Sequence, residues 1–249
     1  VALDELGIAR DPAADVDLGS GVHVNVTNGN LTFHLPLFTD KGAGLLTELG
    51  LTYNSRAGDG GRLGTGWTHT YDWTLARFGG LELDPEAYVR LPSGRRVDYA
   101  GDPFLLPWTG EGESSYVTLP TPTVSMLNLK DGASVKFDSF GVPIQILHAK
   151  AQPCALDLAY HSSGDLRLLD AVTNAFIGRE VLFFYDASNR LFEVHRASGD
   201  LYRFGYDASG RMDDLLLQPV GAVSAPIRWK CGYYDATSGE TGAYQDLMA

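Results

Sequence analysis

Cysteine is scarce in this 249-residue chain, which contains only Cys154 and Cys231. Two cysteines this far apart match no zinc-ligand spacing and no Cys-x-x-Cys redox motif. We therefore expect two free, buried thiols that behave as small hydrophobic side chains. A single disulfide between them is the alternative. The six histidines show no ligand spacing either, so the sequence predicts no metal site and no cofactor.

Basic residues are also few. The 19 lysines and arginines are scattered among 31 acidic residues, and the formal net charge is −12. Binding to nucleic acid needs clustered positive charge, so a nucleic-acid partner is disfavoured. No run approaches the ~20 consecutive apolar residues that a membrane-spanning helix requires. The N-terminal stretch lacks the basic-then-apolar order of a signal peptide, and the chain does not begin with Met.

Catalytic signatures are missing as well. The sequence contains no Gly-x-Ser-x-Gly elbow, no Walker loop and no His-Glu-x-x-His motif. The stretch GDGGRLGTG (residues 58–66) lacks the lysine and the following helix of a phosphate-binding loop, which favours a surface loop. His69 lies three residues from Asp72, but such residues point to opposite faces of a strand. We expect His69 to pack structurally and the protein not to be an enzyme. Hydrolysis by His69 with a nearby carboxylate is the alternative.

The chain is instead rich in residues that interrupt regular secondary structure. Twenty-nine glycines and 12 prolines separate short runs of β-branched and aromatic residues, a pattern typical of short strands and tight turns. Residues 21–38 alternate apolar and polar side chains on both sides of Asn28-Gly29, the strongest two-residue hairpin signal. No segment shows a convincing amphipathic helix. The sequence predicts an all-β fold of successive antiparallel hairpins in a twisted, spiralling sheet.

One tetrapeptide occurs twice. Tyr-Asp-Ala-Ser begins at Tyr185 and again at Tyr206, and an arginine follows each copy at the same offset. Alternating residues enter each copy as a strand, and an Asp at the first turn position can bind backbone N–H groups ahead of it. The fourth turn position carries Asn189 or Gly210, the residue types that best accept a left-handed conformation. We therefore interpret Asp186 and Asp207 as turn residues rather than as a catalytic acid/base pair.

Related starts at Phe137, Tyr160 and Tyr234 extend the pattern at intervals of about 21 to 28 residues, the range typical of arrays of one supersecondary unit. The runs YDASGRM and GDLYRFGYD resemble the repeats of the RHS/YD-repeat family, which includes bacterial polymorphic toxins. In the first half, VNVTNGNLTFHLP, LTYNSRAGDGGRLGTGWTHTYDWTL and LPSGRRVDY resemble the domain that precedes those repeats. The residues that carry this second resemblance are Asn28, Gly29, Tyr53, Asn54, Gly66, Trp67, His69, Tyr71 and Asp72.

Composition predicts an acidic leader over 1–20 and a proline-rich connection over 101–126. The resemblance implies an N-terminal RHS-type β domain over 21–100 and a YD-repeat array over 127–249. It also implies a function. In that family the repeats wind into a hollow β-shell around a C-terminal toxin, and the N-terminal part helps close one end and connects to a delivery apparatus such as type VI secretion.

The chain departs from the family in two respects. It has too few repeats to close a large shell, and it contains neither the acidic autoproteolysis segment nor a toxin domain. We therefore expect a fragment of a longer protein, or an unusually short member, whose partner is the remaining shell or toxin segment or a second chain. Delivery would start from the bacterial cytoplasm without a visible signal peptide. The alternative is a carbohydrate or cell-surface binding module that uses exposed Trp67, Trp73, Trp108 and Trp229.

Overall fold

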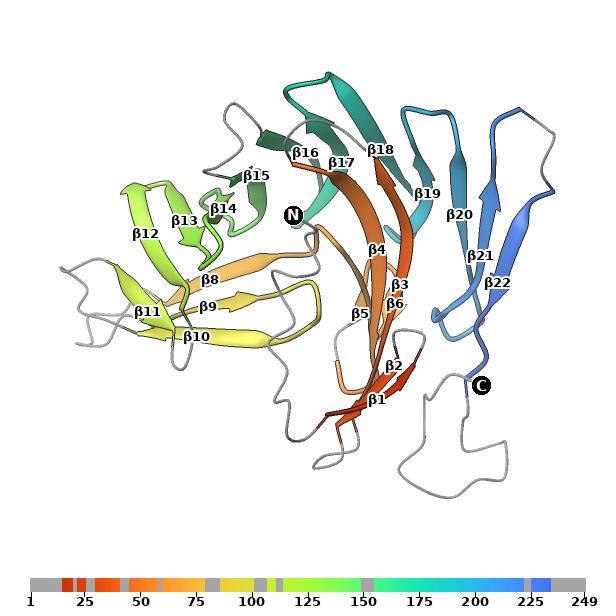
Figure 1. Cartoon of the computed structure of the whole chain (residues 1–249), viewed down its shortest axis with the longest axis horizontal. Coiled ribbons are helices and arrows are strands. Elements are labelled where there is room, and N and C mark those ends of the chain that lie inside the picture. The colour runs from red at the N-terminus through yellow and green to blue at the C-terminus, as the bar shows by residue number, and fades with distance from the viewer. Residues whose placement is uncertain are drawn as a thin grey trace. The chain divides into compact units, whose positions relative to one another are not determined.

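The computed structural model describes residues 15–19, 22–25, 30–40, 45–57, 60–78, 86–100, 107–110, 114–148, 155–221 and 225–233. Every helix or strand assigned in these ranges is a β-strand, which confirms the predicted all-β class (Figure 1). None of these ranges holds a helix long and apolar enough to cross a membrane. The chain divides into two compact units that interleave along the sequence, so each is described by itself.

The first unit includes Pro36–Gly50 and Thr70–Glu180. Its strands pair antiparallel with their neighbours in sequence, as a run of hairpins does. They are β8 (Thr74–Phe78), β9 (Glu86–Arg90), β10 (Arg96–Ala100), β11 (Trp108–Gly110), β12 (Tyr116–Thr121), β13 (Val124–Asn128), β14 (Ala133–Phe137), β15 (Pro143–His148), β16 (Ala155–Ser163) and β17 (Leu166–Asn174). The stretch 101–126, expected as a connection, thus contributes β11, β12 and the start of β13.

The second unit takes in Leu51–His69, the described part of Ala9–Leu35 and the described part of Val181–Ala249. Its repeat strands pair in sequence order. They are β18 (Arg179–Tyr185), β19 (Leu191–His195), β20 (Leu201–Tyr206), β21 (Met212–Gln218) and β22 (Ile227–Lys230). The boundary between the units falls inside β18, and also inside two strands of the first half, β3 (Asn30–Asp40) and β4 (Thr47–Asn54).

The remaining strands of the second unit are short. They are β1 (Asp15–Gly19), β2 (Val22–Asn25), β5 (Gly60–Gly61), β6 (Gly64–Thr65) and β7 (Trp67–His69). β1 comes from the predicted leader and pairs with β2, and β2 pairs antiparallel with β3, which confirms the predicted hairpin. Asn28 and Gly29 themselves lie outside the described residues. β7 pairs with the second half of β4, and β5 pairs with β6.

Alternation of side chains decides which face of each sheet is buried. In β14 every second residue, Ala133, Val135 and Phe137, is almost fully buried, and in β20 the same holds for Tyr202 and Phe204. Full burial of a large apolar side chain contributes about 1.5–3 kcal/mol to folding. The residues between them are at least partly exposed, so each unit builds its core from one face of its hairpins.

Within the described ranges, six hairpin connections share one hydrogen-bonded geometry. The first turn residue donates its N–H to the carbonyl of the fifth, and the fourth donates to the carbonyl of the first. The turns span residues 91–95, 129–133, 138–142, 186–190, 196–200 and 207–211. Their fourth residues all have positive φ, as in hairpin turns closed by a residue in the left-handed region. Asn189, with φ of 59°, is the one non-glycine with positive φ among the residues described, as the exchange with Gly210 predicts.

Two expected repeat starts behave differently. β16 runs through Tyr160 to Ser163, and a two-residue turn at Gly164 and Asp165 leads into β17, so the repeat start at Tyr160 lacks the five-residue turn of the others. The polar run His161-Ser162-Ser163 looks like a turn in sequence but continues an exposed strand. Tyr234 lies outside the described residues.

Candidate functional site

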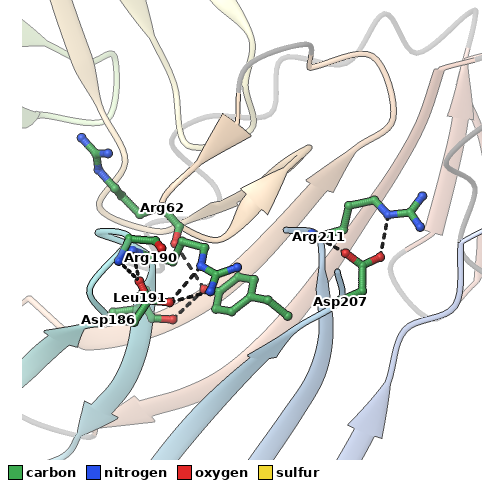
Figure 2. Close-up of polar contacts among 8 residues, drawn as sticks. Arg62, Asp186, Arg190, Leu191, Asp207 and Arg211 are labelled. Carbon is green, nitrogen blue, oxygen red and sulfur yellow. Dashed lines mark hydrogen bonds and ion pairs between the residues drawn. The ribbon is translucent and has the colours of Figure 1, made fainter. Parts of the chain in front are cut away.

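The turn Asp186–Arg190 is organised by its own aspartate (Figure 2). Asp186 Oδ1 accepts hydrogen bonds from the backbone N–H groups of Ser188 at 2.8 Å and Arg190 at 2.9 Å. Oδ2 accepts from Arg190 Nε at 2.9 Å and pairs with the same guanidinium at 2.7 Å. Burial of the carboxyl opposes its ionisation, but these hydrogen bonds outweigh burial and lower the pKa of Asp186. The predicted backbone role of Asp186 is therefore confirmed.

The turn Asp207–Arg211 repeats the three hydrogen bonds to its aspartate. Asp207 Oδ1 accepts from Ser209 N at 2.9 Å and Arg211 N at 2.8 Å, and Oδ2 accepts from Arg211 Nε at 2.8 Å. Burial again opposes ionisation and is again outweighed, so the pKa of Asp207 is lowered. Each aspartate is occupied by its own turn (Figure 2). The two carboxylates therefore stabilise two separate turns and do not form one acid/base pair.

Arg190 extends its turn to the following hairpin. Its guanidinium carbon lies 4.4 Å from the ring centroid of Tyr206, and the Tyr206 hydroxyl donates to Leu191 O at 2.6 Å. Burial raises the pKa of Tyr206, so the phenol stays protonated and remains a donor. The sequence showed an arginine at this offset but gave it no role. The structure makes Arg190 the connection between one turn and the next strand.

Arg211 stands in the same relation to Tyr233. The guanidinium carbon is 4.6 Å from the ring centroid, and the Tyr233 hydroxyl donates to Met212 O. The repeat pattern in the sequence predicts the next repeat start at Tyr234-Asp235, one residue after Tyr233. Among the described residues, strand register points to Tyr233. Continuing the β21–β22 pairing of Asp214 with Lys230 places Tyr233 opposite Arg211.

The glycine-rich segment packs against these turns. The carbonyl of Arg62 accepts hydrogen bonds from Leu191 N at 2.7 Å and from the Tyr206 hydroxyl at 3.2 Å (Figure 2). A Cβ at Gly64 would stand 2.5 Å from Gly210 O. Leu63 between them is fully buried. The expected surface loop is therefore wrong for Arg62–Gly66, because the segment offers its backbone, rather than its side chains, to the repeat turns.

Four residues of the first-half motif gather beside it. The Tyr53 and Trp67 rings lie 5.2 Å apart, and Asn54 N donates to Gly66 O at 2.8 Å. A Cβ at Gly66 would stand 2.8 Å from the Tyr53 ring, so glycine makes room for that ring. Trp67 Nε1 donates to the Tyr233 hydroxyl at 2.7 Å. This last bond joins the first-half motif to a tyrosine of the repeats.

The rest of that motif is used for packing. His69 is 2% exposed, and its ring centroid lies 5.6 Å from that of Phe183. Tyr71 belongs to the other unit and is equally buried, and burial raises its pKa. Asp72 follows it in that unit and is partly exposed. The boundary between the two units follows His69, so it divides the continuous sequence motif of residues 66–72.

The tryptophans do not form an exposed platform. Trp67, Trp73 and Trp108 are 0%, 2% and 6% exposed, and only Trp229 of the four expected residues is partly exposed. The alternative of a carbohydrate-binding module required at least two of these tryptophans to be exposed in one groove. The burial of three of them contradicts that requirement for the residues proposed. The indoles of Trp67, Trp73 and Trp108 lie in the cores of their units.

The described residues contain no group of three His, Cys, Asp or Glu side chains that could hold a metal. Cys231 is free, and burial raises its pKa to about 11, so its thiol stays protonated at neutral pH. Cys154 lies outside the described residues.

Residues 21–99 match a protein family described as Domain of unknown function (DUF6531). No curated protein matches the chain. The matched range contains the glycine-rich segment and the Tyr53–Trp67 pair. The turns at 186–190 and 207–211 lie beyond it. The contacts described above therefore join a recognised sequence region to the part of the chain that the match does not cover.

Proposed function

We propose that the chain is a structural part of an RHS-type shell that encapsulates a C-terminal toxin and helps deliver it. The main support for the proposal is that a repeated turn closes consecutive antiparallel hairpins. In addition, the glycine-rich segment of the family-matched region 21–99 contacts two of those turns. A hairpin cannot bury its apolar face alone and gains stability from its neighbours. A series of hairpins that stabilise one another in this way is suited to form the wall of a β-shell.

The chemistry of the turns supports the same role. Asp186 and Asp207 are each engaged by an arginine and by two backbone N–H groups. His69 packs against an aromatic ring inside a core. A catalytic pair needs carboxyl or imidazole groups in differently tuned environments that converge on a substrate. The two repeat carboxylates instead share one environment and one task.

In this proposal the partners are the remaining shell and toxin segments of the same protein or a second chain, together with a component of a secretion apparatus. The protein would be made in the bacterial cytoplasm and exported. The surface charge suits such a container, because a net charge of −12 favours solubility and repulsion between copies.

The test uses the complete protein encoded by the reading frame that contains this sequence, produced with any neighbouring gene product needed for viability. We expect further repeats and a variable C-terminal domain. After native digestion with a nonspecific protease, that domain should stay intact and co-elute with the repeat region.

The matched control is the same C-terminal domain produced alone, which should be digested rapidly. Two results would count against the proposal. One is a reading frame without further repeats or a C-terminal domain. The other is equal digestion of that domain in the complete protein and by itself.

A further inference from the structure

Two exposed phenylalanines lie next to each other on neighbouring strands of the second unit. Phe184 in β18 is 42% exposed, and Phe192 in β19 is 45% exposed. Phe184 pairs with Glu193, and the register then shifts, so Phe192 is the extra residue of a β-bulge beside that pair. Phe183 and Val194 on the same two strands are buried in the core, so both exposed rings project from the opposite face of the sheet.

The next repeat shows that the fold does not require these two rings. The register shift recurs at the same place, between Gly205 and Tyr206. The buried positions keep their apolar character 21 residues further on, where Phe183 corresponds to Phe204, Leu191 to Met212 and Val194 to Leu215. The exposed positions change, because Phe184 corresponds to Gly205 and Phe192 to Asp213. The same bulged hairpin forms with glycine and aspartate there, so folding of the repeat does not explain the two phenylalanines.

Polar side chains fix the surface beside the rings. The ring centroids of His195 and Phe184 lie 4.5 Å apart, and His195 Nε2 is 2.9 Å from Glu193 Oε2. Arg203 in β20 donates through Nε to Glu193 Oε1 at 2.7 Å. Among the described residues this is the one polar contact of the Arg203 side chain, and 48% of that side chain is exposed. The two terminal nitrogens of its guanidinium are therefore available as donors to a ligand.

We propose that Phe184, Phe192 and Arg203 form a docking surface for a peptide segment of a partner protein in which apolar side chains flank an aspartate or glutamate. Phenylalanine has no polar tip, so the rings offer apolar contact area and no hydrogen bond to a sugar hydroxyl. A guanidinium matches the planar geometry of a carboxylate, and Glu193 already orients that of Arg203. Side chains that are ordered before binding lose less entropy when the partner arrives.

The charge of the chain favours this occupant over a second copy of the protein. Copies that each carry a net charge of −12 repel one another. A short acidic segment can instead place one carboxylate on Arg203 while its apolar side chains cover the rings. Aromatic residues and arginine are the side chains enriched in protein interfaces. The surface is argued from these contacts and does not depend on the proposed shell function.

The test selects peptides from a phage-displayed library of random sequences on the immobilised 249-residue chain. Phages that bind the Phe184→Ala/Phe192→Ala double variant are removed beforehand. We expect the enriched peptides to carry an acidic residue between apolar residues. In a fluorescence polarisation titration, such a peptide should bind the wild-type chain at least about tenfold more tightly than the double variant.

A second variant tests the carboxylate. Arg203→Gln should weaken the same peptide about fivefold, and it should not weaken a peptide whose acidic residue is replaced by its amide. Phe140→Ala is the matched control, since Phe140 is a phenylalanine of the first unit that is 69% exposed. Its affinity for the peptide should equal that of the wild type. The double variant should unfold at nearly the same urea concentration as the wild type, because both rings are already half exposed.

The proposal is overturned if no peptide is enriched on the wild-type chain, or if the enriched peptides carry no acidic residue. A clearly lower urea midpoint of the double variant would also overturn it, since the rings would then belong to the core. Sedimentation of the chain alone gives a further decision. Self-association of the wild type that the double variant lacks would assign the surface to a second copy and reject the peptide partner.

Discussion

Arg190 lies over the ring of Tyr206, its guanidinium carbon 4.4 Å from the ring centroid, while its Nε donates to Asp186 Oδ2. The arginine is therefore oriented by its own turn before it meets the next hairpin. A cation above an aromatic face contributes about 0.5–2 kcal/mol, depending on its exposure. Arg211 and Tyr233 repeat the relation, so the contact belongs to the repeat and couples neighbouring hairpins.

A double-mutant cycle of Arg190→Met and Tyr206→Leu should reveal that coupling. We expect a coupling free energy of about 1 kcal/mol in urea unfolding. Either single change already abolishes the Arg190–Tyr206 contact, so the double variant should lose less stability than the sum of the two single losses. Arg203→Met with Tyr206→Leu is the matched control, since Arg203 pairs with Glu193 at 2.7 Å instead of with the tyrosine. Equal coupling in both cycles would contradict a specific Arg190–Tyr206 contact.

Asn189 should tolerate glycine and resist alanine. Its φ of 59° lies in the left-handed region, where a Cβ-bearing residue without a helpful side chain is strained. Asn189→Gly should change the free energy of unfolding by less than about 0.5 kcal/mol, and Asn189→Ala should lower it by about 1 kcal/mol. Urea titration measures both. A loss on Asn189→Gly as large as on Asn189→Ala would show that the amide, not the backbone angle, is what the turn needs.

Acid should weaken the repeat turns. The pKa values of Asp186 and Asp207 are lowered in the folded protein, so both carboxylates stabilise it fully above the unfolded pKa of about 4. That contribution is lost as the pH falls through the folded pKa, when protonation frees the arginines. Stability measured from pH 7 to pH 2.5 should therefore drop below about pH 4.

Asp207→Asn isolates this effect, because the amide oxygen can still accept from the two backbone N–H groups. The variant should be less stable than wild type at pH 7, and the difference should shrink as the pH falls below about 4. Asp200, Asp214 and Glu193 also have lowered pKa values, so part of the acid sensitivity should persist in the variant. A constant difference across the pH range would rule out an electrostatic role for Asp207.

The turns were predictable from sequence because their requirements are local: an aspartate to bind N–H groups and glycine or asparagine to turn back. The docking of Arg62 and Gly64 was not, because it is made by main-chain atoms between segments more than 120 residues apart. The glycines are visible in the sequence, but a glycine-rich stretch predicts a surface loop as readily as a close backbone contact. Tyr233 was missed because a motif search aligns letters, whereas the contact follows strand register.

Burial of Trp67 and Trp73 depends on which face of their strands is covered. Alternation in a sequence tells which residues share a face, but not which face another element covers. Both indole N–H groups have polar partners: Trp67 donates to the distant Tyr233 hydroxyl at 2.7 Å, and Trp73 donates to the nearby Thr70 carbonyl at 3.1 Å. An indole whose N–H is satisfied can be buried without penalty.

Asn174 offers a prediction in the first unit. Its side chain is 1% exposed, donates to Leu45 O at 3.0 Å and accepts from Phe176 N and Ile177 N at 3.1 and 3.3 Å. Asn174→Asp keeps the acceptor but places a buried carboxylate against a carbonyl. We expect a loss of roughly 2–4 kcal/mol at pH 7 in urea unfolding, because the charge is desolvated and the donor is gone.

The loss from Asn174→Asp should shrink on acidification, opposite to the general acid sensitivity of the chain. Burial raises the pKa of a carboxyl, so the new aspartate should be protonated at mildly acidic pH and can then donate to Leu45 O. Stability relative to wild type should rise between pH 7 and about pH 5. Asn128→Asp is the control, since Asn128 is only partly buried and its carboxylate can reach water. Its smaller loss should change little over that range. An Asn174→Asp deficit that is independent of pH would show that the loss does not come from burying a carboxylate.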